Sequence, residues 1–388
     1  MNSRPIVLID ATAIPADIGG VGRYVEELLA RVDPTGPLEY AVVAQAAAVE
    51  RLGAIAPNVR VISGPHWISS RPLRMIWEQV SLPRLAARLG ATVIHSPHYT
   101  MPVFAGRPVV VTLHDATFFS DPEVHSRGKR VFFRAWSRYS LKHAAASIVP
   151  SAATRDELAR YISLNVARVV VIHHGVDLDL FHPPTGAERA AAAELVGAEH
   201  WIAFLGTLEP RKNVGALVRA FGELGDDVLA KFPDLRLVLA GAKGWDTSLA
   251  AAIESSPQAD RIVQTGYVPV EALTGLLGGS VLVCYPSLGE GFGLPLLEAM
   301  ACGASVLTTP RLALPEVGGN AALYSEPDEH SLAASITTLA LDDEERAKLS
   351  RLARERAQTF SWSATANAHA AVFASVVAHD HAIKDPSS

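Results

Sequence analysis

The sequence has few cysteines, few charged residues and no long apolar run. Only Cys284 and Cys302 occur in the 388 residues, so a disulfide framework is excluded by count, and we expect buried, reduced thiols. Hydrophobic residues make up 49% of the chain and charged ones only 19%, which is typical of a large, well-buried globular protein. The formal net charge of −6 gives no reason to expect a nucleic-acid partner. No apolar segment is long enough to cross a bilayer.

Several common signatures are also missing. The first residues, MNSRPIVLID, run into a predicted strand without a signal-peptide pattern, so we expect a cytoplasmic protein. No G-x-x-x-x-G-K-[ST] sequence occurs, which disfavours a P-loop nucleotidase. Gly19, Gly20 and Gly22 begin nine positions after the first strand and follow a G-G-x-G spacing, which disfavours a dinucleotide site. They could still let the backbone approach an anion, or form a plain glycine-rich turn.

Both halves of the chain alternate short β-rich runs with helical stretches, which indicates parallel α/β sheets. In the first half these runs are 6–10, 40–44, 59–63, 92–96, 109–114, 147–150 and 169–173. In the second half they are 201–206, 235–241, 261–266, 281–286 and 305–310. Because the chain is too long for one ordinary core, we predict two Rossmann-like doubly wound domains that face a cleft.

The domain boundary is predicted within HGVDLDLFHPPTG, where glycine, aspartates and a proline pair interrupt the alternating pattern. We therefore predict an N-terminal domain over 1–175 and a C-terminal domain over 176–360. A closing helix over 361–380 is expected to pack back on the N-terminal domain. The ligand is expected between the two domains.

The stretch PSLGEGFGLPLLEAMACG carries Glu290 in a glycine-rich turn and Glu298 one turn into an apolar helix. The turn follows the predicted strand 281–286, so it lies where an open α/β sheet holds its ligands. It also precedes a helix N-terminus, whose free N–H groups favour a phosphate. Two carboxylates beside a phosphate site indicate a ligand that carries hydroxyl groups.

Two pairs of polar residues follow other predicted strands. Arg211 and Lys212 come after the first strand of the second half, where they could clamp a diphosphate. For such a pair alone, exposed charges beside a helix are the commoner interpretation. His114 and Asp115 end a strand of the first half and are candidates for binding or acid–base work, or for a structural hydrogen-bonded pair.

Two further features have both a functional and a structural interpretation. The segment HSPH has no identifiable third metal ligand, and we interpret its histidines as cleft wall. A basic stripe recurs every four residues on one predicted helix: Arg130, Arg134, Arg138 and Lys142. This stripe could contact anionic lipid or an acidic acceptor, or it could be the solvated face of a helix whose other side is in the core.

Together these motifs resemble those of the retaining glycosyltransferases of family 4, which have the two-domain GT-B fold. The matching segments fall in family order over nearly the whole chain: GGVGRY, LHD, VPS, HHGVD, GTLEPRKN, LAGAKG, GYV, EGFGLPLLEAMACG and the closing FSW. The most specific of them is the E-x7-E spacing from Glu290 to Glu298, with an Arg–Lys pair upstream.

The resemblance implies roles for the residues at matching positions. Glu290 would hold hydroxyls of the donor sugar, and Glu298 would hold the ribose. Arg211 and Lys212 would bind the diphosphate, and His114 would lie beside the transferred sugar. The remaining implied site positions are Asp115, Gly19, Gly20, Gly22, Val268, Gly291, Phe292, Gly293 and Leu294.

The resemblance also implies a nucleotide-sugar donor, a saccharide or lipid-linked acceptor, anomeric retention and no metal ion. The forms GTLEPRKN and HSPHYTMP look most like bacterial mannosyltransferases that build O-antigen-type polysaccharide. GDP-mannose is therefore the first donor expected, followed by GDP-rhamnose, GDP-fucose and UDP-sugars. A sugar-nucleotide epimerase or phosphorylase of the same fold, and a catalytically silent sugar-nucleotide-binding protein, stay open as alternatives.

Overall fold

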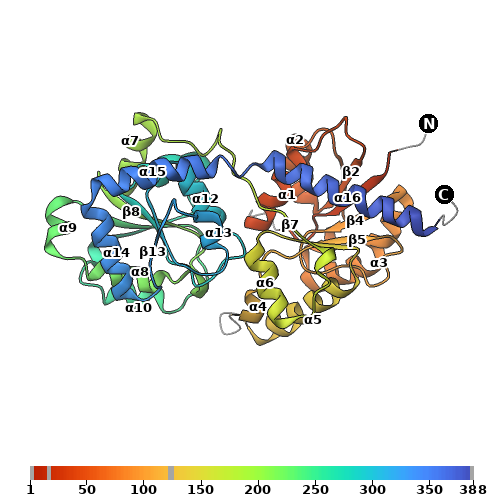
Figure 1. Cartoon of the computed structure of the whole chain (residues 1–388), viewed down its shortest axis with the longest axis horizontal. Coiled ribbons are helices and arrows are strands. Elements are labelled where there is room, and N and C mark those ends of the chain that lie inside the picture. Colours follow the sequence, from red (N-terminus) through yellow and green to blue (C-terminus); the bar gives the residue numbers. More distant parts are fainter. Residues whose placement is uncertain (1–3, 15–18, 121–125, 385–388) are drawn as a thin grey trace. The chain divides into compact units, whose positions relative to one another are not determined.

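The computed structural model describes residues 4–14, 19–120 and 126–384 of the chain (Figure 1). The chain divides into two compact units: unit 1 consists of Met1–Gly175 and Ser361–Ser388, and unit 2 of Val176–Phe360. Unit 2 is therefore one continuous stretch, whereas unit 1 is completed by a segment that follows unit 2 in the sequence.

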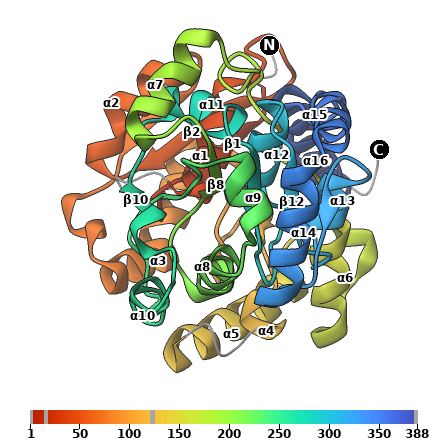
Figure 2. The same cartoon turned by 90° about the vertical axis from the view of Figure 1, so that its left-hand side faces the viewer.

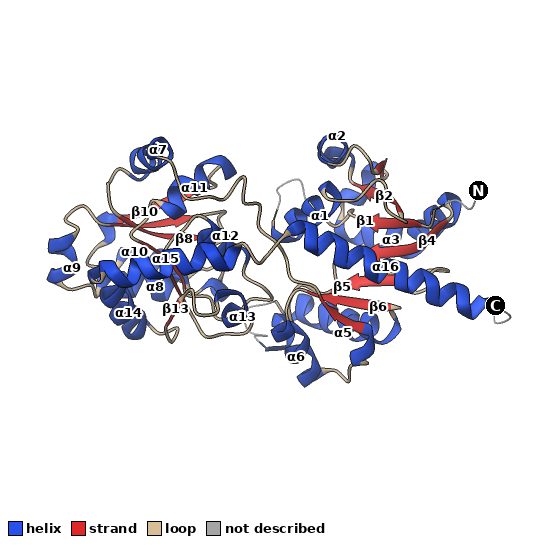
Figure 3. Ribbon diagram, turned by 45° about the horizontal axis from the view of Figure 1, so that its top comes forward, coloured by secondary structure: helices blue, strands red, loops and turns tan. Residues whose placement is uncertain are grey.

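Unit 1 is built on a seven-stranded parallel sheet with the strand order β3-β2-β1-β4-β5-β6-β7 (Figure 3). Its strands are β1 (Ile6–Asp10), β2 (Glu39–Ala44), β3 (Arg60–Ser63), β4 (Ala91–Ser96), β5 (Val109–Thr112), β6 (Ala146–Val149) and β7 (Val169–Val171). The order reverses between β1 and β4, and an open α/β sheet forms its ligand crevice at the carboxyl ends of such a pair.

The helices of unit 1 are α1 (Gly20–Ala30), α2 (Val49–Ile55), α3 (Arg71–Leu89), α4 (Thr117–Ser120), α5 (Arg127–His143), α6 (Ala152–Tyr161) and α16 (Trp362–Lys384). Helix α16 contacts α1 and β4, so the last segment of the chain belongs to the first sheet (Figure 1). Its residues His369 and Phe373 are fully buried.

Unit 2 contains a six-stranded parallel sheet with the order β10-β9-β8-β11-β12-β13. Its strands are β8 (Trp201–Leu205), β9 (Arg236–Ala240), β10 (Ile262–Gly266), β11 (Leu282–Tyr285), β12 (Val306–Thr308) and β13 (Leu323–Tyr324). The strand order reverses between β8 and β11, which gives unit 2 its own switch point.

The helices of unit 2 are α7 (Gly186–Val196), α8 (Val214–Gly222), α9 (Asp226–Lys231), α10 (Leu249–Glu254), α11 (Val270–Gly278), α12 (Leu294–Ala301), α13 (Leu314–Gly318), α14 (Glu329–Leu341) and α15 (Asp343–Ala357). Helices α10 and α14 pack on α8, and α11 packs on α7, as layers on the sheet (Figure 2). Both units are thus doubly wound and Rossmann-like, as the sequence predicts.

The strands are apolar because both faces of a parallel sheet are covered by helices. Within β1, for example, Val7, Leu8 and Ile9 are all fully buried. Every β-rich run expected from the sequence overlaps an observed strand, and among the strands of the described residues only the two-residue β13 was not anticipated. None of the described helices combines the length and the apolar composition that a bilayer crossing needs.

Candidate active site

The two adjacent cations of unit 2 lie at its switch point, directly after β8. A single 3-10 turn, Pro210–Lys212, carries Arg211 and Lys212. Asn213 follows with φ 57°, in the left-handed region that asparagine tolerates better than most residues. The Asn213 amide donates to the carbonyl of Pro327 at 2.7 Å and makes no capping bond to α8. Asn213 therefore occupies the N-cap position, but its side chain fastens the loop instead.

The carboxylate of Glu290, after β11, accepts hydrogen bonds from four side chains. Its Oε1 atom accepts from Lys212 Nζ at 2.6 Å, from the Ser287 hydroxyl at 2.6 Å and from the Tyr285 hydroxyl at 2.9 Å. Its Oε2 atom accepts from Arg211 Nη1, and Lys212 Nζ also donates to the Tyr285 hydroxyl. Residues that follow β8 and β11 are thus joined in one polar cluster.

Charge and burial act in opposite directions on this cluster. Burial alone would raise the pKa of Glu290. The positive charges of Arg211 and Lys212 and the hydrogen bonds outweigh burial and lower this pKa to about 2. Burial lowers the pKa of the Lys212 ammonium below its usual value, although the charge of Glu290 partly opposes that change. Glu290 is therefore ionised throughout the neutral range and acts as an acceptor only.

Arg211 is held by two further acceptors. Its Nη1 donates to the carbonyl of Gly289 at 2.7 Å, and its Nη2 to Glu209 Oε1 at 2.7 Å. The cluster therefore balances two cations with two carboxylates. The side chains of Arg211 and Glu290 keep 15% and 9% of their surface exposed, so an anionic ligand can reach the cations and compete with the carboxylates.

The glycine-rich turn after Glu290 leads into α12. Gly293 has φ 104°, a backbone conformation that favours glycine, and a Cβ atom there would also lie in tight contact, 3.0 Å, with Leu314 Cδ2. Gly291 and Phe292 are buried beside it, and Leu294 is the first residue of α12. Glu298 is 3% exposed within α12 and makes interactions of its own. The turn thus presents a helix N-terminus to the same crevice.

The loops after β9 and β10 complete this edge of unit 2. A Cβ atom at Gly241, after β9, would lie 2.2 Å from the carbonyl oxygen of Gly206, after β8, so the loops that follow β8 and β9 can approach only because residue 241 is glycine. Val268 follows β10 and is 6% exposed, with its side chain in the apolar core. The Val268 side chain is therefore a core side chain of unit 2.

In unit 1 the predicted glycines surround the start of α1. Gly19 is the N-cap residue with φ −89°, and Gly20 is the first residue of the helix. A Cβ atom at either position would have no described atom within 4 Å, so neither packing nor backbone conformation demands glycine there. Gly22 is buried inside α1. The space at this helix N-terminus is consistent with the close approach of a ligand to the backbone.

His114 and Asp115 follow β5 but do not form a pair. The His114 ring donates from Nε2 to the carbonyl of Pro97 at 2.7 Å, so its Nδ1 atom carries no proton in the neutral ring. Burial lowers the pKa of His114, which favours this neutral form. Asp115 instead accepts from the backbone N–H and the hydroxyl of Thr117 and begins α4. His114 is thus a positioned acceptor, and the described hydrogen bonds of the Asp115 side chain are made with Thr117.

A hydrogen-bond chain in the core of unit 1 involves His95 and three residues to which no role was assigned from the sequence: Tyr24, Thr112 and His369. His369 Nδ1 donates to the carbonyl of Thr365 at 2.7 Å, so its Nε2 accepts from the Tyr24 hydroxyl at 2.6 Å. The Tyr24 oxygen then accepts from the Thr112 hydroxyl at 3.1 Å, which itself accepts from His95 Nε2 at 2.9 Å. The Tyr24 ring also lies edge-on to the His114 ring, with centroids 5.1 Å apart. The chain thus joins α16, α1, β5 and β4.

Two interpretations made from the sequence need correction. His95 is fully buried and belongs to this chain, so it is a core residue and not cleft wall. Within the basic stripe on α5, Arg134 donates to the carbonyls of Phe118 and Phe119, and the Arg138 guanidinium lies over the Phe119 ring at 5.1 Å. Part of the stripe therefore holds α5 to the loop around α4.

The chain contains an Asp-x-Asp triplet, Asp177-Leu178-Asp179, a pattern that binds a metal ion in some transferases. Asp177 Oδ1 accepts from the backbone N–H groups of Asp179 and Leu180, so this triplet closes a turn. Over the described stretches of the chain, no three histidine, cysteine or acidic side chains are grouped as a metal ion would require.

Two family models match the chain, one in each unit. Residues 18–180 match the model described as Glycosyltransferase Family 4, and residues 189–356 match that described as Glycosyl transferases group 1. The O-antigen chain mannosyltransferase B of Escherichia coli is 31% identical over 274 residues, which are 70% of this chain and 71% of that protein. The chain belongs to glycosyltransferase family 4.

Further relatives and solved structures are also similar to this glycosyltransferase. The D-inositol 3-phosphate glycosyltransferase of Mycobacterium avium is 33% identical over 228 residues, and the chain spans about half of its length, 52%. Among solved structures, sucrose-phosphate synthase from Thermosynechococcus elongatus superposes with a TM-score of 0.77 at 20% identity, over 97% of this chain and 100% of that one. HepE from Anabaena, in complex with UDP-glucose, superposes with a TM-score of 0.75 at 19% identity, over 96% of this chain and 99% of that one. These neighbours share the GT-B fold.

Proposed function

We propose that this glycosyltransferase moves mannose from GDP-mannose to a saccharide or lipid-linked acceptor, with retention of the anomeric configuration. The observation that carries the proposal is the cluster of Arg211, Lys212 and Glu290 at the switch point of unit 2. Two cations for a diphosphate stand there beside a carboxylate for sugar hydroxyls. Mannose is chosen because a relative at 31% identity is an O-antigen chain mannosyltransferase.

The residues would divide the work as follows. The ion pairs of Arg211 with Glu209 and Glu290, and of Lys212 with Glu290, weaken when the two cations bind the diphosphate. The negative charge of the diphosphate grows as its bond to the sugar breaks. Glu290 accepts hydrogen bonds from the sugar hydroxyls, and Glu298 from the ribose. The neutral His114 ring offers Nδ1 as an acceptor to a hydroxyl of the transferred sugar.

The proposed step is front-face attack. The acceptor oxygen bonds to the anomeric carbon, the bond from that carbon to the donor phosphate oxygen breaks, and the acceptor proton passes to a phosphate oxygen. Arg211, Lys212 and the N-terminus of α12 neutralise the leaving group, so no metal ion is needed.

Donor screening with product analysis tests the proposal. The full chain is incubated with GDP-mannose or other GDP- and UDP-sugars and an acceptor, in EDTA, and released nucleotide is detected by mass spectrometry. We expect free GDP in the mass spectrum. We also expect NMR to show a mannosyl linkage with the same anomeric configuration as the donor. An inverted linkage, or turnover that requires an added divalent ion, would contradict the mechanism. Nucleotide binding without transfer would point to a silent binding protein.

A UDP-sugar donor is the second candidate, because HepE from Anabaena shares the fold and was solved with UDP-glucose. The same donor panel separates the two, since the guanine and uracil nucleotides differ in mass.

We also propose that Arg130 and Lys142, the stripe residues without such intramolecular contacts in the described structure, bring the enzyme to anionic lipid. Co-sedimentation with anionic vesicles should weaken when both become Gln. If it does not change, α5 serves only as a solvated helix.

A further inference from the structure

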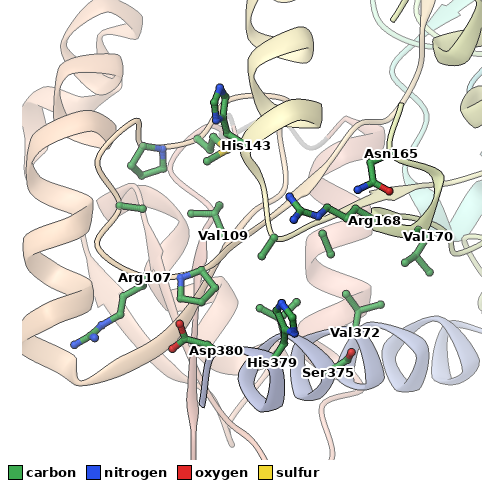
Figure 4. Close-up of a pocket in the computed structure, with 18 of the residues that line it drawn as sticks. Arg107, Val109, His143, Asn165, Arg168, Val170, Val372, Ser375, His379 and Asp380 are labelled. Atoms are coloured by element: carbon green, nitrogen blue, oxygen red, sulfur yellow. The ribbon is translucent and has the colours of Figure 1, made fainter. Parts of the chain in front are cut away.

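Unit 1 contains a groove of about 1220 Å³ at the edge of its sheet where β5 and β6 begin (Figure 4). Val109 and Ala146, the first residues of β5 and β6, line it together with Val170 of β7. The loop 101–108, the end of α5 and helix α16 form its walls. Within unit 1, His114 follows the carboxyl end of β5, so the groove lies at the other edge of the sheet from His114.

The lining from α16 is a row of small, mostly apolar side chains. These residues are spaced as one helical face: Ala368, Ala371, Val372, Ser375 and Val376. Because no large side chain stands in this row, the groove stays open along the helix. From Ala368 to His379 the row is about 16 Å long, given a rise of 1.5 Å per residue. A single extended hydrocarbon chain fits such a shape.

The polar groups at the groove are mainly basic. Arg168 extends toward the middle of the lining residues, and His379 projects from α16 toward it, whereas Arg107 points away (Figure 4). Within the described residues, the Arg168 guanidinium makes no recorded hydrogen bond or ion pair and is exposed. Asp380 is the one acidic residue among the described lining residues. An anionic head group would therefore be attracted to Arg168.

The rim adds apolar surface. Phe104 is 88% exposed and Val103 42% exposed, both in the wall loop. An exposed aromatic side chain beside an apolar groove is typical of a binding surface, because a ligand that covers it removes apolar area from water.

We propose that this groove binds a monomeric amphiphile made of one hydrocarbon chain and one anionic head group. The chain lies along the small-residue face of α16, and the head group pairs with Arg168. Asn165 and Asp380, the one amide and the one carboxylate among the described lining residues, stand at opposite ends of the drawn lining and do not gather around one sugar-sized space (Figure 4). The proposal does not depend on the donor or the acceptor of the glycosyltransferase.

Calorimetric titration of the full chain with dodecyl phosphate, below the concentration at which it forms micelles, tests the proposal. Dodecyltrimethylammonium supplies the same chain with the opposite charge, and inorganic phosphate supplies the head group alone. We expect dodecyl phosphate to bind roughly tenfold more tightly, or better, than either probe, since both parts contribute to affinity. Equal affinities, or binding of anionic vesicles without binding of monomeric dodecyl phosphate, would overturn the proposal.

Variants at exposed positions locate the site. Arg168→Gln should weaken dodecyl phosphate binding by about tenfold or more, whereas Arg60→Gln, at an exposed arginine of β3, should not change it. Ala371→Phe fills the groove and should abolish binding, whereas Ala371→Ser keeps the space and should preserve it. The melting temperature without ligand confirms that each variant is folded. If Arg168→Gln and Ala371→Phe both bind normally, the amphiphile binds elsewhere and the inference is wrong.

Discussion

At the scale of single residues, the two glutamates of the E-x7-E motif are in different settings. Glu290 is joined to both cations, whereas Glu298 lies within α12. Glu290→Gln keeps the size but weakens charge-assisted bonds to the transferring sugar, so kcat should fall more than KM rises. Glu298→Gln affects the ribose, which changes little in the transition state, so its effect should be mainly on KM. Steady-state kinetics with varied donor separates the two outcomes; an effect of Glu290→Gln on KM alone would contradict the assignment.

The cations themselves should affect turnover strongly. Arg211→Ala or Lys212→Ala removes a positive charge where the leaving diphosphate becomes more negative. By analogy with oxyanion donors, each should lower kcat about a hundredfold or more, roughly 3 kcal/mol. Arg219→Ala is the matched control, because Arg219 pairs with Glu329 on the exposed surface of unit 2 and such pairs contribute little. Near-normal turnover of Lys212→Ala, beside an inactive Glu298→Gln, would show that the site is assigned wrongly.

At the scale of elements, the contact of α16 with α1 depends on the Tyr24 hydroxyl. Tyr24→Phe leaves the buried Nε2 of His369 without its donor, which should destabilise this contact by about 1–3 kcal/mol. Hydrogen exchange of α16 and α1 peptides measures the change as faster opening. Tyr40→Phe is the control: Tyr40 also lies near α16, 6.4 Å from Phe373 between ring centroids, and its hydroxyl has no recorded bond to the described residues. Equal protection in both variants would mean that the chain of hydrogen bonds adds no stability.

The contact between α16 and α1 shows why sequence patterns predict only part of this structure. Strands such as β1 and β11 could be predicted, because each is a short apolar run between turn residues. The positions of Arg211, Lys212 and Glu290 followed from their places after such strands. Their mutual ion pairs did not, because side-chain pairing depends on how two loops approach in space. His369 and Tyr24 are 345 positions apart, and no local pattern connects them.

At the scale of the whole molecule, the two units should respond differently to acid. Burial lowers the pKa of His98 and His369 to about 4, and also holds that of His95 below its usual value of 6.5. In the unfolded chain these histidines become protonated below pH 6.5. In the folded unit 1, His98 and His369 stay neutral until about pH 4. The contribution of these histidines to the free energy of unfolding is therefore complete above pH 6.5 and falls as the pH is lowered toward 4. In unit 2, Glu290 has a pKa of about 2 against the usual 4.5, so its contribution is lost only below pH 4.5.

Pulsed hydrogen exchange after equilibration at several pH values tests this difference in the full chain. Between pH 6.5 and 4.5, peptides of β4, β5 and α16 should lose protection, while those of β8 and β11 keep it. Loss of protection in unit 2 first would show that other groups control acid unfolding.

Helix α16 has a consequence for the order in which the protein matures during translation. The ribosome makes residues 176–360 before α16, so unit 2 has its complete sequence while unit 1 still lacks a helix that its sheet requires. Until α16 emerges, Tyr24 has no His369 to accept its hydroxyl proton, and the surface that Phe373 covers stays open to water. We therefore expect unit 1 to be prone to aggregate until α16 has been synthesised, and unit 2 can finish folding before unit 1.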